Sequence, residues 1–522
     1  MAGTKPAFYI TTAISYVNGS PHLGHAYEGI LTDVMARFKR LDGHEVFFLT
    51  GTDEHGQKVA KTAEKNGMAP KAFCDKIAAE FVQQTKDLNI SNDDFIRTTE
   101  PRHYKASQGI WNAIGKNNPE DIYLGHYNGW YSVRDEGYFT ESELTEAPDG
   151  TKLAPSGAPV EWVEEPSYFF RLSAYTEKLL QLYADRPEFI EPESRRNEVI
   201  SFVKKGLQDV SISRTNFKWG VPVPGDPDHV MYVWLDALTN YITGVGYPDT
   251  DSDSYRTFWP ADFHVIGKDI IRFHCVYWPA FLMAAGLELP KCVFAHGFIN
   301  VEGQKMSKSV GNVISPSYLV DTFGLDQMRY LLMREVPHGQ DGNFSEAHAI
   351  ERINSDLANG LGNLAQRSLS MIAKNCEGKV PAHGDFTPED RALMTHAHEE
   401  MMPQIREEFS AFRFNRGLEK IWKLVDAANA YIDEQAPWAL KKTDTNRMGT
   451  VLYVLAETIR CLAIAVQPVV PGSAAKMLDQ LAVPEDARDY AHISAGHMLK
   501  SGTSLPAPEG VFPRIQIEEA AE

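Results

Sequence analysis

Two histidines lie near the N-terminus in the run His22-Leu23-Gly24-His25. Strand-forming residues precede this run at positions 8–14, and apolar residues at helical spacing follow it, so the pair is expected where a strand ends and a helix begins. Backbone N–H groups and the helix dipole attract anions at such a point. The imidazoles could therefore donate hydrogen bonds to phosphate oxygens. A pair of ordinary surface histidines beside a turn is the alternative that this run alone leaves open.

A second cluster, Lys305-Met306-Ser307-Lys308-Ser309, follows a turn that contains Gly303. Two lysines with hydroxyls nearby suit a clamp on a polyphosphate, because they stabilise the charge that builds on departing pyrophosphate. A solvated Lys/Ser loop is the alternative, and for this run alone it is the favoured one. The occurrence of both clusters in one chain is far more specific than either.

The elements that must position these clusters form a βαβ unit. Strand-like residues at 8–14 lead through a turn at 16–21 to a helical pattern that stops near Gly43, and a second strand follows at 45–49. Ligands of parallel sheets bind at the carboxyl ends of the strands, which is where the histidine turn and the turn at 51–56 lie. Parallel-sheet character returns at 263–267 and 293–299.

Composition describes an ordinary globular chain of several domains. It has 522 residues, 43% of them hydrophobic, and a formal net charge of −19. That charge argues against a protein that coats nucleic acid in bulk, but not against an RNA enzyme whose basic residues gather on one face. We expect no membrane segment, because no run approaches the ~20 apolar residues that a membrane helix needs, and no signal peptide.

The cysteines predict neither disulfides nor a cysteine zinc site. There are five of them, an odd number, and no two have C-x-x-C spacing. Small buried side chains in a reducing cytosol are the preferred interpretation.

The two clusters together resemble the signature motifs of the class I aminoacyl-tRNA synthetases, which take the forms HIGH and KMSKS. Further runs are similar to the methionyl branch of that family, and the similarity covers nearly the whole chain up to about residue 440. These runs are residues 13–20 (AISYVNGS), 51–56 (GTDEHG), 232–241 (YVWLDALTNY) and 267–274 (GKDIIRFH), with Trp278. The resemblance implies a cytoplasmic enzyme that joins L-methionine to ATP and transfers it to the 3′ end of tRNA(Met).

The fold that follows is α/β: a Rossmann-type parallel-sheet catalytic domain, a mixed α/β insertion and a C-terminal all-α helical bundle. We expect the catalytic domain at 1–118 and 229–299, the insertion at 119–228, and the lysine loop with a region that contacts the tRNA stem at 300–350. The bundle, expected at 351–522, would bind the anticodon.

The resemblance also assigns a methionine site. Asp53 would bind the ammonium group, and the Ile14 backbone and the Tyr241 hydroxyl would approach the thioether sulfur. The other residues of the implied site are Ala13, Tyr16, Trp234, Ala237, Ile270, His274 and Trp278. A turn-capping role for Asp53 and plain core packing for the two tryptophans are the alternatives.

On the nucleotide side, the resemblance implies contacts to ATP from each segment that carries a motif. These residues are His22, Gly24, His25, Glu28, Gly267, Asp269, His296 and Ile299. Asp269 would bind ribose hydroxyls. Lys308 would be the main phosphate clamp with Lys305 assisting, and Mg²⁺ would bridge the phosphates. No general base is needed, because the methionine carboxylate is already a nucleophile.

One departure from the family concerns zinc. Many relatives carry a zinc knuckle in the insertion, but Ser132 and Asp135 stand where its first two cysteines would fall. Residues 154–157, at its second half, hold neither cysteine nor histidine. Zinc prefers thiolate and imidazole ligands, so we predict an insertion without metal.

In the helical part, Asn359, Asn363 and Arg367 are spaced four apart and are expected on one helix face. The family's anticodon readers match Asn363, Arg367 and Trp438; a solvated polar face and a core tryptophan are the alternatives. Too few residues follow position 499 for the dimerisation module that some relatives append, so a monomer is expected.

Three other functions are alternatives for a chain with these motifs. A class I synthetase for leucine, isoleucine, valine or cysteine would share the motifs, although residues 121–228 are short for an editing domain. A non-catalytic RNA-binding relative would be expected to lose His22, His25 or Lys308, and all three are present. A small-molecule adenylyltransferase would lack the helical half.

Overall fold

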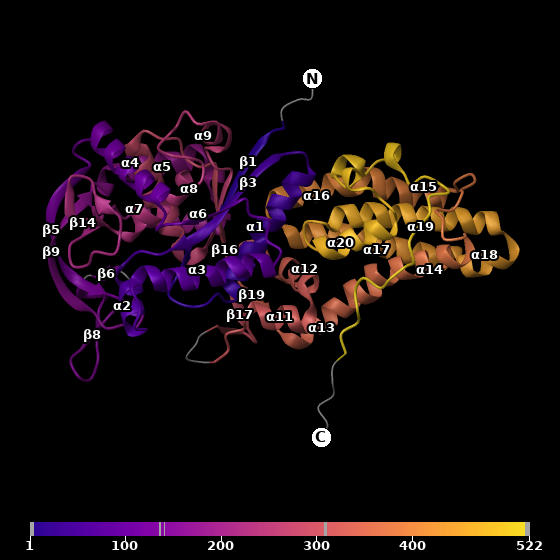
Figure 1. The fold of residues 1–522 in the computed structure, drawn as a ribbon, viewed down its shortest axis with the longest axis horizontal. Coiled ribbons are helices and arrows are strands. Elements are labelled where there is room, and N and C mark those ends of the chain that lie inside the picture. Colours follow the sequence, from indigo (N-terminus) through magenta and orange to yellow (C-terminus); the bar gives the residue numbers. More distant parts are fainter. Residues whose placement is uncertain (1–4, 135–136, 140, 307–310, 517–522) are drawn as a thin grey trace. The chain divides into compact units, whose positions relative to one another are not determined.

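The computed structural model describes residues 5–134, 137–139, 141–306 and 311–516. The chain folds into two compact units, whose elements are labelled in Figure 1. One unit comprises Ala7–Pro21 and Phe47–His296, and the other comprises Met1–Pro6, His22–Val46 and Gly297–Glu522.

The first unit is built on a seven-stranded sheet with the order β10-β16-β15-β1-β3-β2, in which β4 also pairs with β3. Its strands are β1 (Ala7–Thr12), β2 (Ser15–Tyr16), β3 (Glu45–Asp53), β4 (Asp94–Arg97), β10 (Ile190–Glu191), β15 (Phe263–Gly267) and β16 (Cys292–His296). The pairs β10–β16, β15–β16, β1–β15, β2–β3 and β3–β4 are parallel. β1 and β16 are buried along almost their whole length, as expected for strands covered on both faces.

The predicted parallel α/β sheet is therefore confirmed, with three boundary corrections. The strand expected at 45–49 extends to Asp53, so the first half of the turn expected at 51–56 belongs to β3. The strand expected at 8–14 ends at Thr12, and the short β2 follows as a separate strand. The strand expected at 293–299 ends at His296, because Ile299–Val301 forms β17, which pairs with β18 (Gln304–Lys305) and β19 (Gly342–Phe344) in a different sheet.

Helices of this unit connect the strands and cover the sheet's apolar side chains. They are α2 (Gln57–Lys65), α3 (Pro70–Asp87), α4 (Pro101–Asn117), α5 (Thr176–Asp185), α6 (Glu193–Val203), α7 (Val233–Leu238), α8 (Asn240–Thr243), α9 (Asp253–Phe258) and α10 (Trp278–Ala285), which continues the π-helix η5 (Phe273–Tyr277). One large core cluster joins strands and helices from Tyr9 to Ala295, and a smaller one packs α2 and α3 around Phe73 and Phe81.

The insertion is dominated by a long antiparallel ribbon. Strand β5 (Ile122–Ser132) pairs with β9 (Glu161–Phe170), where the sequence predicted only short strands. Strands β6 (Gly137–Phe139) and β11 (Val210–Ser211) flank the ribbon. The remaining strands are β7 (Thr145–Glu146), β8 (Lys152–Leu153), β12 (Ser213–Arg214), β13 (Pro222–Val223) and β14 (Asp226–Met231).

The second unit contains α1 (Leu23–Leu41), the helix that follows the histidine run. Asp33 of α1 forms a fully buried ion pair with Arg329 of α12 (Leu325–Glu335), at 2.6 Å. Arg329 also donates to the carbonyl oxygens of Pro468 and Val469 at 2.9 and 3.0 Å. The histidine helix is thereby bonded to residues from the C-terminal half of the chain.

The all-α region of this unit confirms the predicted helical bundle. Its elements are α11 (Pro316–Phe323), α13 (Glu346–Arg352), η6 (Ile353–Gly362), α14 (Asn363–Asn375), α15 (Pro388–Thr395), η7 (His396–Glu400), α16 (Met401–Ser410), α17 (Phe414–Gln435), α18 (Pro437–Thr443), α19 (Thr445–Val466) and α20 (Pro471–Gln480). Helix α19 is long and apolar enough to cross a membrane by composition, which corrects the statement that no run approaches that length. Its apolar window is completely buried inside the protein, as expected of a core helix.

After α20 an extended segment returns along the bundle (Figure 1). The backbones of Val380 and Thr503 are hydrogen-bonded at 2.9 Å, and Ile515 pairs twice with the Asn354 side chain, at 2.8 and 2.9 Å. The segment is therefore part of the folded unit.

Candidate functional site

The predicted phosphate-binding histidines form a compact cap at the start of α1. Nδ1 of His22 accepts a hydrogen bond from the Gly24 backbone N–H at 3.1 Å, and Nδ1 of His25 accepts from the His22 backbone N–H at 3.2 Å. The two rings stack with centroids 3.9 Å apart. Because both Nδ1 atoms accept, each neutral ring carries its proton on Nε2, where it can act as a donor.

Burial and the neighbouring His22 ring lower the pKa of His25 to about 3. His25 is therefore neutral at pH 7, and any bond that it gives to a phosphate is a dipolar one. The helix N-terminus supplies further positive potential at the same point. This geometry suits the predicted phosphate contact, which stays a prediction.

Three of the predicted nucleotide residues meet at the carboxyl edge of the parallel sheet. Gly267 and His296, the last residues of β15 and β16, are direct register partners. A Cβ on Gly267 would lie 2.6 Å from Oδ1 of Asp269 and 3.9 Å from Cε1 of His296. The side chain of Asp269 is exposed. Glycine is thus required for this close approach, and it leaves the Asp269 carboxylate accessible to a ligand.

The other predicted nucleotide residues belong to the unit that contains α1. Glu28 lies within α1, and Ile299 begins β17 with its side chain buried. Lys305 ends β18 with Nζ 5.1 Å from the ring centre of Phe298. Lys308, the predicted main clamp, lies outside the described residues.

The centre of the predicted amino-acid pocket is a buried pair of polar rings. The Tyr241 hydroxyl lies 2.6 Å from Nε2 of His274, and Nδ1 of His274 lies 3.0 Å from the Ile270 carbonyl oxygen. A carbonyl only accepts, so Nδ1 carries the proton. Burial lowers the pKa of His274 to about 4, against a smaller opposing effect of that carbonyl, so Nε2 is an acceptor at pH 7. The hydroxyl therefore donates to His274, and its oxygen lone pairs remain for other contacts.

Aromatic rings surround this pair. Trp234 stacks on Phe273 with centroids 3.5 Å apart and planes 7° from parallel. Trp278 is fully buried with its ring centroid 6.1 Å from that of Tyr241, so it is part of the core, and its place in the pocket stays a prediction. Sequence reasoning missed Phe273 and also His264, whose ring stacks on Tyr241 at 4.0 Å. The sequence signal that could have identified Phe273 is its place directly before His274.

The remaining pocket residues lie at the ends of neighbouring strands. The Ala13 backbone N–H donates to the carbonyl oxygen of Val265 at 3.0 Å, and Ile14 packs against the core cluster of this unit. Tyr16 and Asp53 are register partners between β2 and β3. Helix α2 begins after Gly56, so Asp53 is not its N-cap residue.

Beside Asp53, the chain is held rigidly by Glu54, which sequence reasoning did not single out. The buried Glu54 carboxylate accepts two bonds from Arg97, at 2.6 and 3.0 Å, and one from the Thr52 hydroxyl at 2.7 Å. Such charge-assisted, paired bonds are among the strongest in proteins. The carboxylate of Asp53 therefore stands on a fixed backbone.

Of the predicted anticodon readers, Asn363 and Trp438 are exposed and Arg367 is half-buried. The row expected at 359, 363 and 367 does not form one regular helix face. Asn359 lies in the π-helix η6, whereas Asn363 begins α14, so the wider π turn changes the spacing between them. The Arg367 guanidinium lies 5.4 Å from the ring centre of Trp438 and 2.7 Å from Oδ1 of Asp433. Trp438 is 45% exposed, which makes the interpretation as a core tryptophan wrong.

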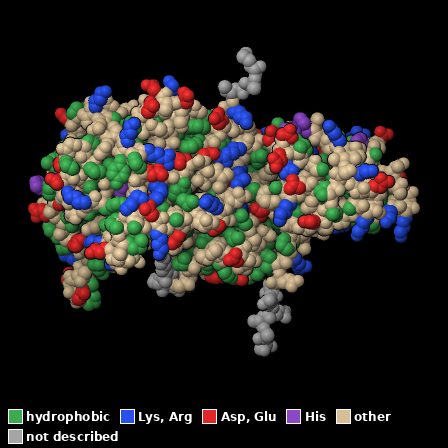
Figure 2. Space-filling view, in the orientation of Figure 1, with side chains coloured by type: hydrophobic (Ala, Val, Ile, Leu, Met, Phe, Trp, Pro, Cys, Tyr) green, Lys and Arg blue, Asp and Glu red, His purple; other side chains and the backbone are tan. Residues whose placement is uncertain are grey.

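Basic side chains accompany this surface. Lys441 and Lys442 lie in the last turn of α18, the short helix that begins next to Trp438. Figure 2 shows lysine and arginine side chains gathered over this end of the bundle. An exposed aromatic ring beside basic groups suits stacking of an unpaired base, with the phosphates held by the lysines.

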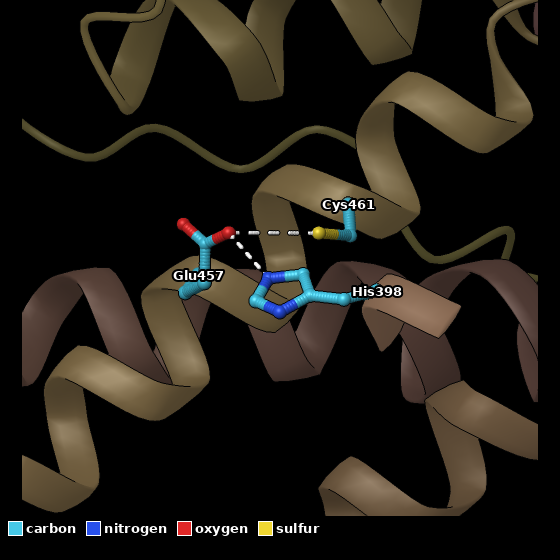
Figure 3. Close-up of side chains that lie close together, drawn as sticks. All are labelled: His398, Glu457 and Cys461. Carbon is cyan, nitrogen blue, oxygen red and sulfur yellow. Dashed lines mark hydrogen bonds and ion pairs between the residues drawn. The ribbon is translucent and has the colours of Figure 1, made fainter. Parts of the chain in front are cut away.

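Within the described residues, one group of potential metal ligands stands out: His398, Glu457 and Cys461, shown in Figure 3. The Glu457 carboxylate accepts from His398 at 2.8 Å and from two nitrogens of Arg460, at 2.6 and 3.0 Å. It also accepts from the Leu499 backbone at 3.0 Å. A guanidinium on the same oxygens repels a cation, so this cluster is a structural junction of the bundle.

The second segment where relatives carry a zinc knuckle is held here by backbone hydrogen bonds. Ala154 and Ala158 are bonded at 2.8 Å, and the Gly157 N–H donates to the Ala154 carbonyl at 2.8 Å. Ser132, at the first cysteine position, is buried at the end of β5. A short hairpin of β7 and β8 precedes this turn. The prediction that the insertion holds no zinc stays a prediction.

Comparisons with known proteins agree with this geometry along the whole chain. Residues 8–369 match the family model "tRNA synthetases class I (M)", and residues 380–522 match "Anticodon binding domain of methionyl tRNA ligase". The methionine–tRNA ligase of Mesorhizobium japonicum is 60% identical over 98% of both chains, and that of Rhizobium meliloti is 59% identical over 100% of both.

Solved structures give the same result. Methionyl-tRNA synthetase of Mycobacterium tuberculosis, in complex with methionyl-adenylate, matches with a TM-score of 0.94 and 54% identity. The match covers 98% of this chain and 100% of that one. The free form of the same enzyme matches with a TM-score of 0.89. Since both parts of the chain match this one family at such identity, the chain belongs to the methionyl-tRNA synthetases, a branch of the class I aminoacyl-tRNA synthetases.

Proposed function

We propose that the chain activates L-methionine with ATP to give methionyl-adenylate and pyrophosphate, and then transfers methionine to the 3′ end of tRNA(Met), using the residues described above. The supporting observation is the buried cluster of Tyr241, His274 and aromatic rings in the unit where Asp53 ends β3. A cavity walled by aromatic rings suits a polarizable thioether. A fixed carboxylate suits an ammonium group.

Methionine binding divides between polar and apolar groups. Asp53 pairs with the ammonium group on the backbone that Glu54 and Arg97 hold in place. Trp234, Ala237, Ile270 and Trp278 contact the side chain. The sulfur, which only accepts weak hydrogen bonds, contacts the Ile14 backbone. The Tyr241 hydroxyl, which donates its hydrogen bond to His274, lies against the sulfur through its oxygen atom.

Activation is an attack of the methionine carboxylate oxygen on the α-phosphorus of ATP, with pyrophosphate leaving. Nε2–H groups of His22 and His25 donate to phosphate oxygens, and Asp269 accepts from ribose hydroxyls. The phosphates of ATP would carry magnesium, which would offset part of their charge. Lys305 and Lys308 stabilise the charge that develops on pyrophosphate, so the rate gain comes from positioning and charge stabilisation.

In the second step, the ribose hydroxyl at the 3′ end of the tRNA attacks the methionyl carbonyl carbon, and AMP leaves. Asn363, Arg367 and Trp438 read the anticodon from the exposed surface of the bundle. We further propose a cytoplasmic monomer. All five cysteines are free thiols, as a reducing compartment permits.

ATP–pyrophosphate exchange with each of the twenty amino acids, without tRNA, tests the activation step. We expect exchange with methionine alone. Asp53→Ala should abolish it, and Asp53→Asn, which keeps the shape but not the charge, should retain a trace at high methionine concentration. Exchange supported by another amino acid would refute the substrate. Normal exchange in folded Asp53→Ala would refute the ammonium contact and leave the reaction itself intact.

A further inference from the structure

A carboxylate that no predicted role uses is buried in the sheet unit, next to the methionine pocket. Asp236 lies on α7 and is 1% exposed. Its Oδ2 lies 2.6 Å from Nδ1 of His55, and its Oδ1 lies 2.7 Å from Nε2 of His103. Both histidines are buried as well. One carboxylate thus joins three segments that are far apart in the sequence.

Protonation in this network is fixed by its partners. Burial alone would raise the pKa of Asp236, but His55 and His103 outweigh it and lower the pKa to about 2, so the group is ionised at neutral pH. An ionised carboxylate only accepts, so Nδ1 of His55 and Nε2 of His103 both carry protons. The far side of His55 is bonded to the Tyr104 hydroxyl at 3.1 Å.

Two members of the network, His55 and Asp236, lie on segments that carry proposed methionine contacts. His55 stands two residues after Asp53 in the same turn. Asp236 stands in the single short helix α7 between Trp234 and Ala237. The charge-assisted bond between Asp236 and His55 therefore sets the distance between the segment that holds the ammonium ligand and the helix that walls the side chain.

His103 anchors this helix from the other side. Its Nδ1 lies 3.1 Å from Oγ1 of Thr243 on α8, the helix that carries Tyr241. Ser107 lies 3.2 Å from His103 Nε2, one turn along α4. The network thus reaches the segments of Asp53, Trp234 and Tyr241 without any of its own side chains belonging to the proposed pocket.

We propose that Asp236, with His55 and His103, is a positioning residue for methionine: it holds the ammonium site and the side-chain site at the spacing of one methionine molecule. The inference rests on the proposed methionine site. It acts on methionine binding and not on ATP, because its bonds lead to the segments that carry Asp53, Trp234 and Tyr241.

The test is pyrophosphate exchange by Asp236→Asn, titrated separately in methionine and in ATP. An asparagine keeps the shape of Asp236, but its amide nitrogen donates where a carboxylate oxygen accepted. The hydrogen bond to one of the two histidines therefore weakens, and neither bond is charge-assisted. We expect the KM for methionine to rise about tenfold or more, with the KM for ATP and kcat changed less than about threefold.

Asp390→Asn is the matched control, because Asp390 is also a buried carboxylate, paired with Arg447 and Tyr431 in the helical bundle. It should lower thermal stability to a similar degree and leave the KM for methionine unchanged. A proportional fall of all kinetic constants in Asp236→Asn would mark a merely structural group and overturn the proposal, as would an unchanged KM for methionine.

Conservative variants of the histidines keep the proposal testable if Asp236→Asn does not fold. His55→Asn can place an amide N–H near the position of Nδ1, and His103→Gln can do so for Nε2. These should keep the KM for methionine near that of the wild type, whereas His55→Ala and His103→Ala should raise it. Equal effects of the conservative and alanine variants would overturn the positioning role. Asp53→Ala, run alongside, reports separately on the methionine site itself.

Discussion

Gly267→Ala is a sharp test of the nucleotide site, because the added methyl group has one specific target. The new Cβ would lie 2.6 Å from Oδ1 of Asp269, below the 3.0 Å under which real Cβ contacts essentially never fall. Asp269 is exposed and can rotate away without disturbing the core. The substitution should therefore leave the fold intact and displace only the carboxylate that we propose binds ribose.

The magnitude follows from the bonds lost. A hydrogen bond to a charged group is worth about 1.5–3 kcal/mol, which corresponds to a rise in the KM for ATP of roughly tenfold to a hundredfold. The KM for methionine should change little, since the atoms nearest to the added Cβ belong to Asp269 and His296 and not to residues of that pocket. Pyrophosphate exchange, titrated in ATP and in methionine, measures both constants.

Gly115→Ala is the matched control. Gly115 lies in α4, and a Cβ there meets open space, so the change should stabilise the helix by about 0.5–1 kcal/mol and leave both KM values unchanged. If folded Gly267→Ala bound ATP as well as the Gly115→Ala control does, Asp269 would not be a ribose ligand and the assignment would have to be withdrawn.

Three further predictions follow from the described geometry. Trp438→Ala should raise the KM for tRNA in aminoacylation and leave tRNA-independent exchange near normal; equal loss of both activities would indicate a structural tryptophan. His274 has a pKa near 4 in the fold against 6.5 when unfolded, so the unfolded chain binds more protons below pH 6.5 and stability should fall toward pH 4, by up to about 1.4 kcal/mol per pH unit. Urea unfolding at pH 7 and pH 5 should show a smaller loss in His274→Gln, and an identical loss would contradict the assignment. Elemental analysis should find no bound zinc and chelator should not change the melting temperature, whereas one tightly held zinc per chain would refute the metal-free insertion.

Much of the fold could be predicted from local patterns in the sequence. The strand–helix–strand order around the histidine run, the return of parallel strands and the helical bundle all follow from periodicity and punctuation, and the structure has them. The caps and irregular turns do not follow in this way. A histidine N-cap on α1 contradicts the usual preference for Ser, Thr, Asp or Asn, and the π turns at Phe273–Tyr277 and Ile353–Gly362 break the 3.6-residue period on which sequence reasoning depends.

For the candidate site, contacts between residues far apart in the sequence could not be predicted. Motif resemblance named His274 and Tyr241, but only the structure shows that the hydroxyl of one is bonded to the ring of the other. Asp236 lies in the family-like run 232–241 but received no role, because its partner His55 is 181 residues away and an aspartate on a helix is usually solvated. Buried polar networks require three-dimensional contacts that no short-range pattern encodes.

The buried pair of Asp33 and Arg329 has a consequence for the order in which the protein can be assembled. The partners are 296 residues apart, and Arg329 also needs the carbonyl oxygens of Pro468 and Val469. During synthesis, the sheet unit has its last strand when His296 leaves the ribosome. Within its own helix Asp33 pairs with Arg37 at 2.7 Å, but its fully buried partner Arg329, and the carbonyl oxygens that Arg329 binds, are made only after most of the chain. The buried contacts of the helix that follows His22 and His25 are thus completed only together with the helical bundle.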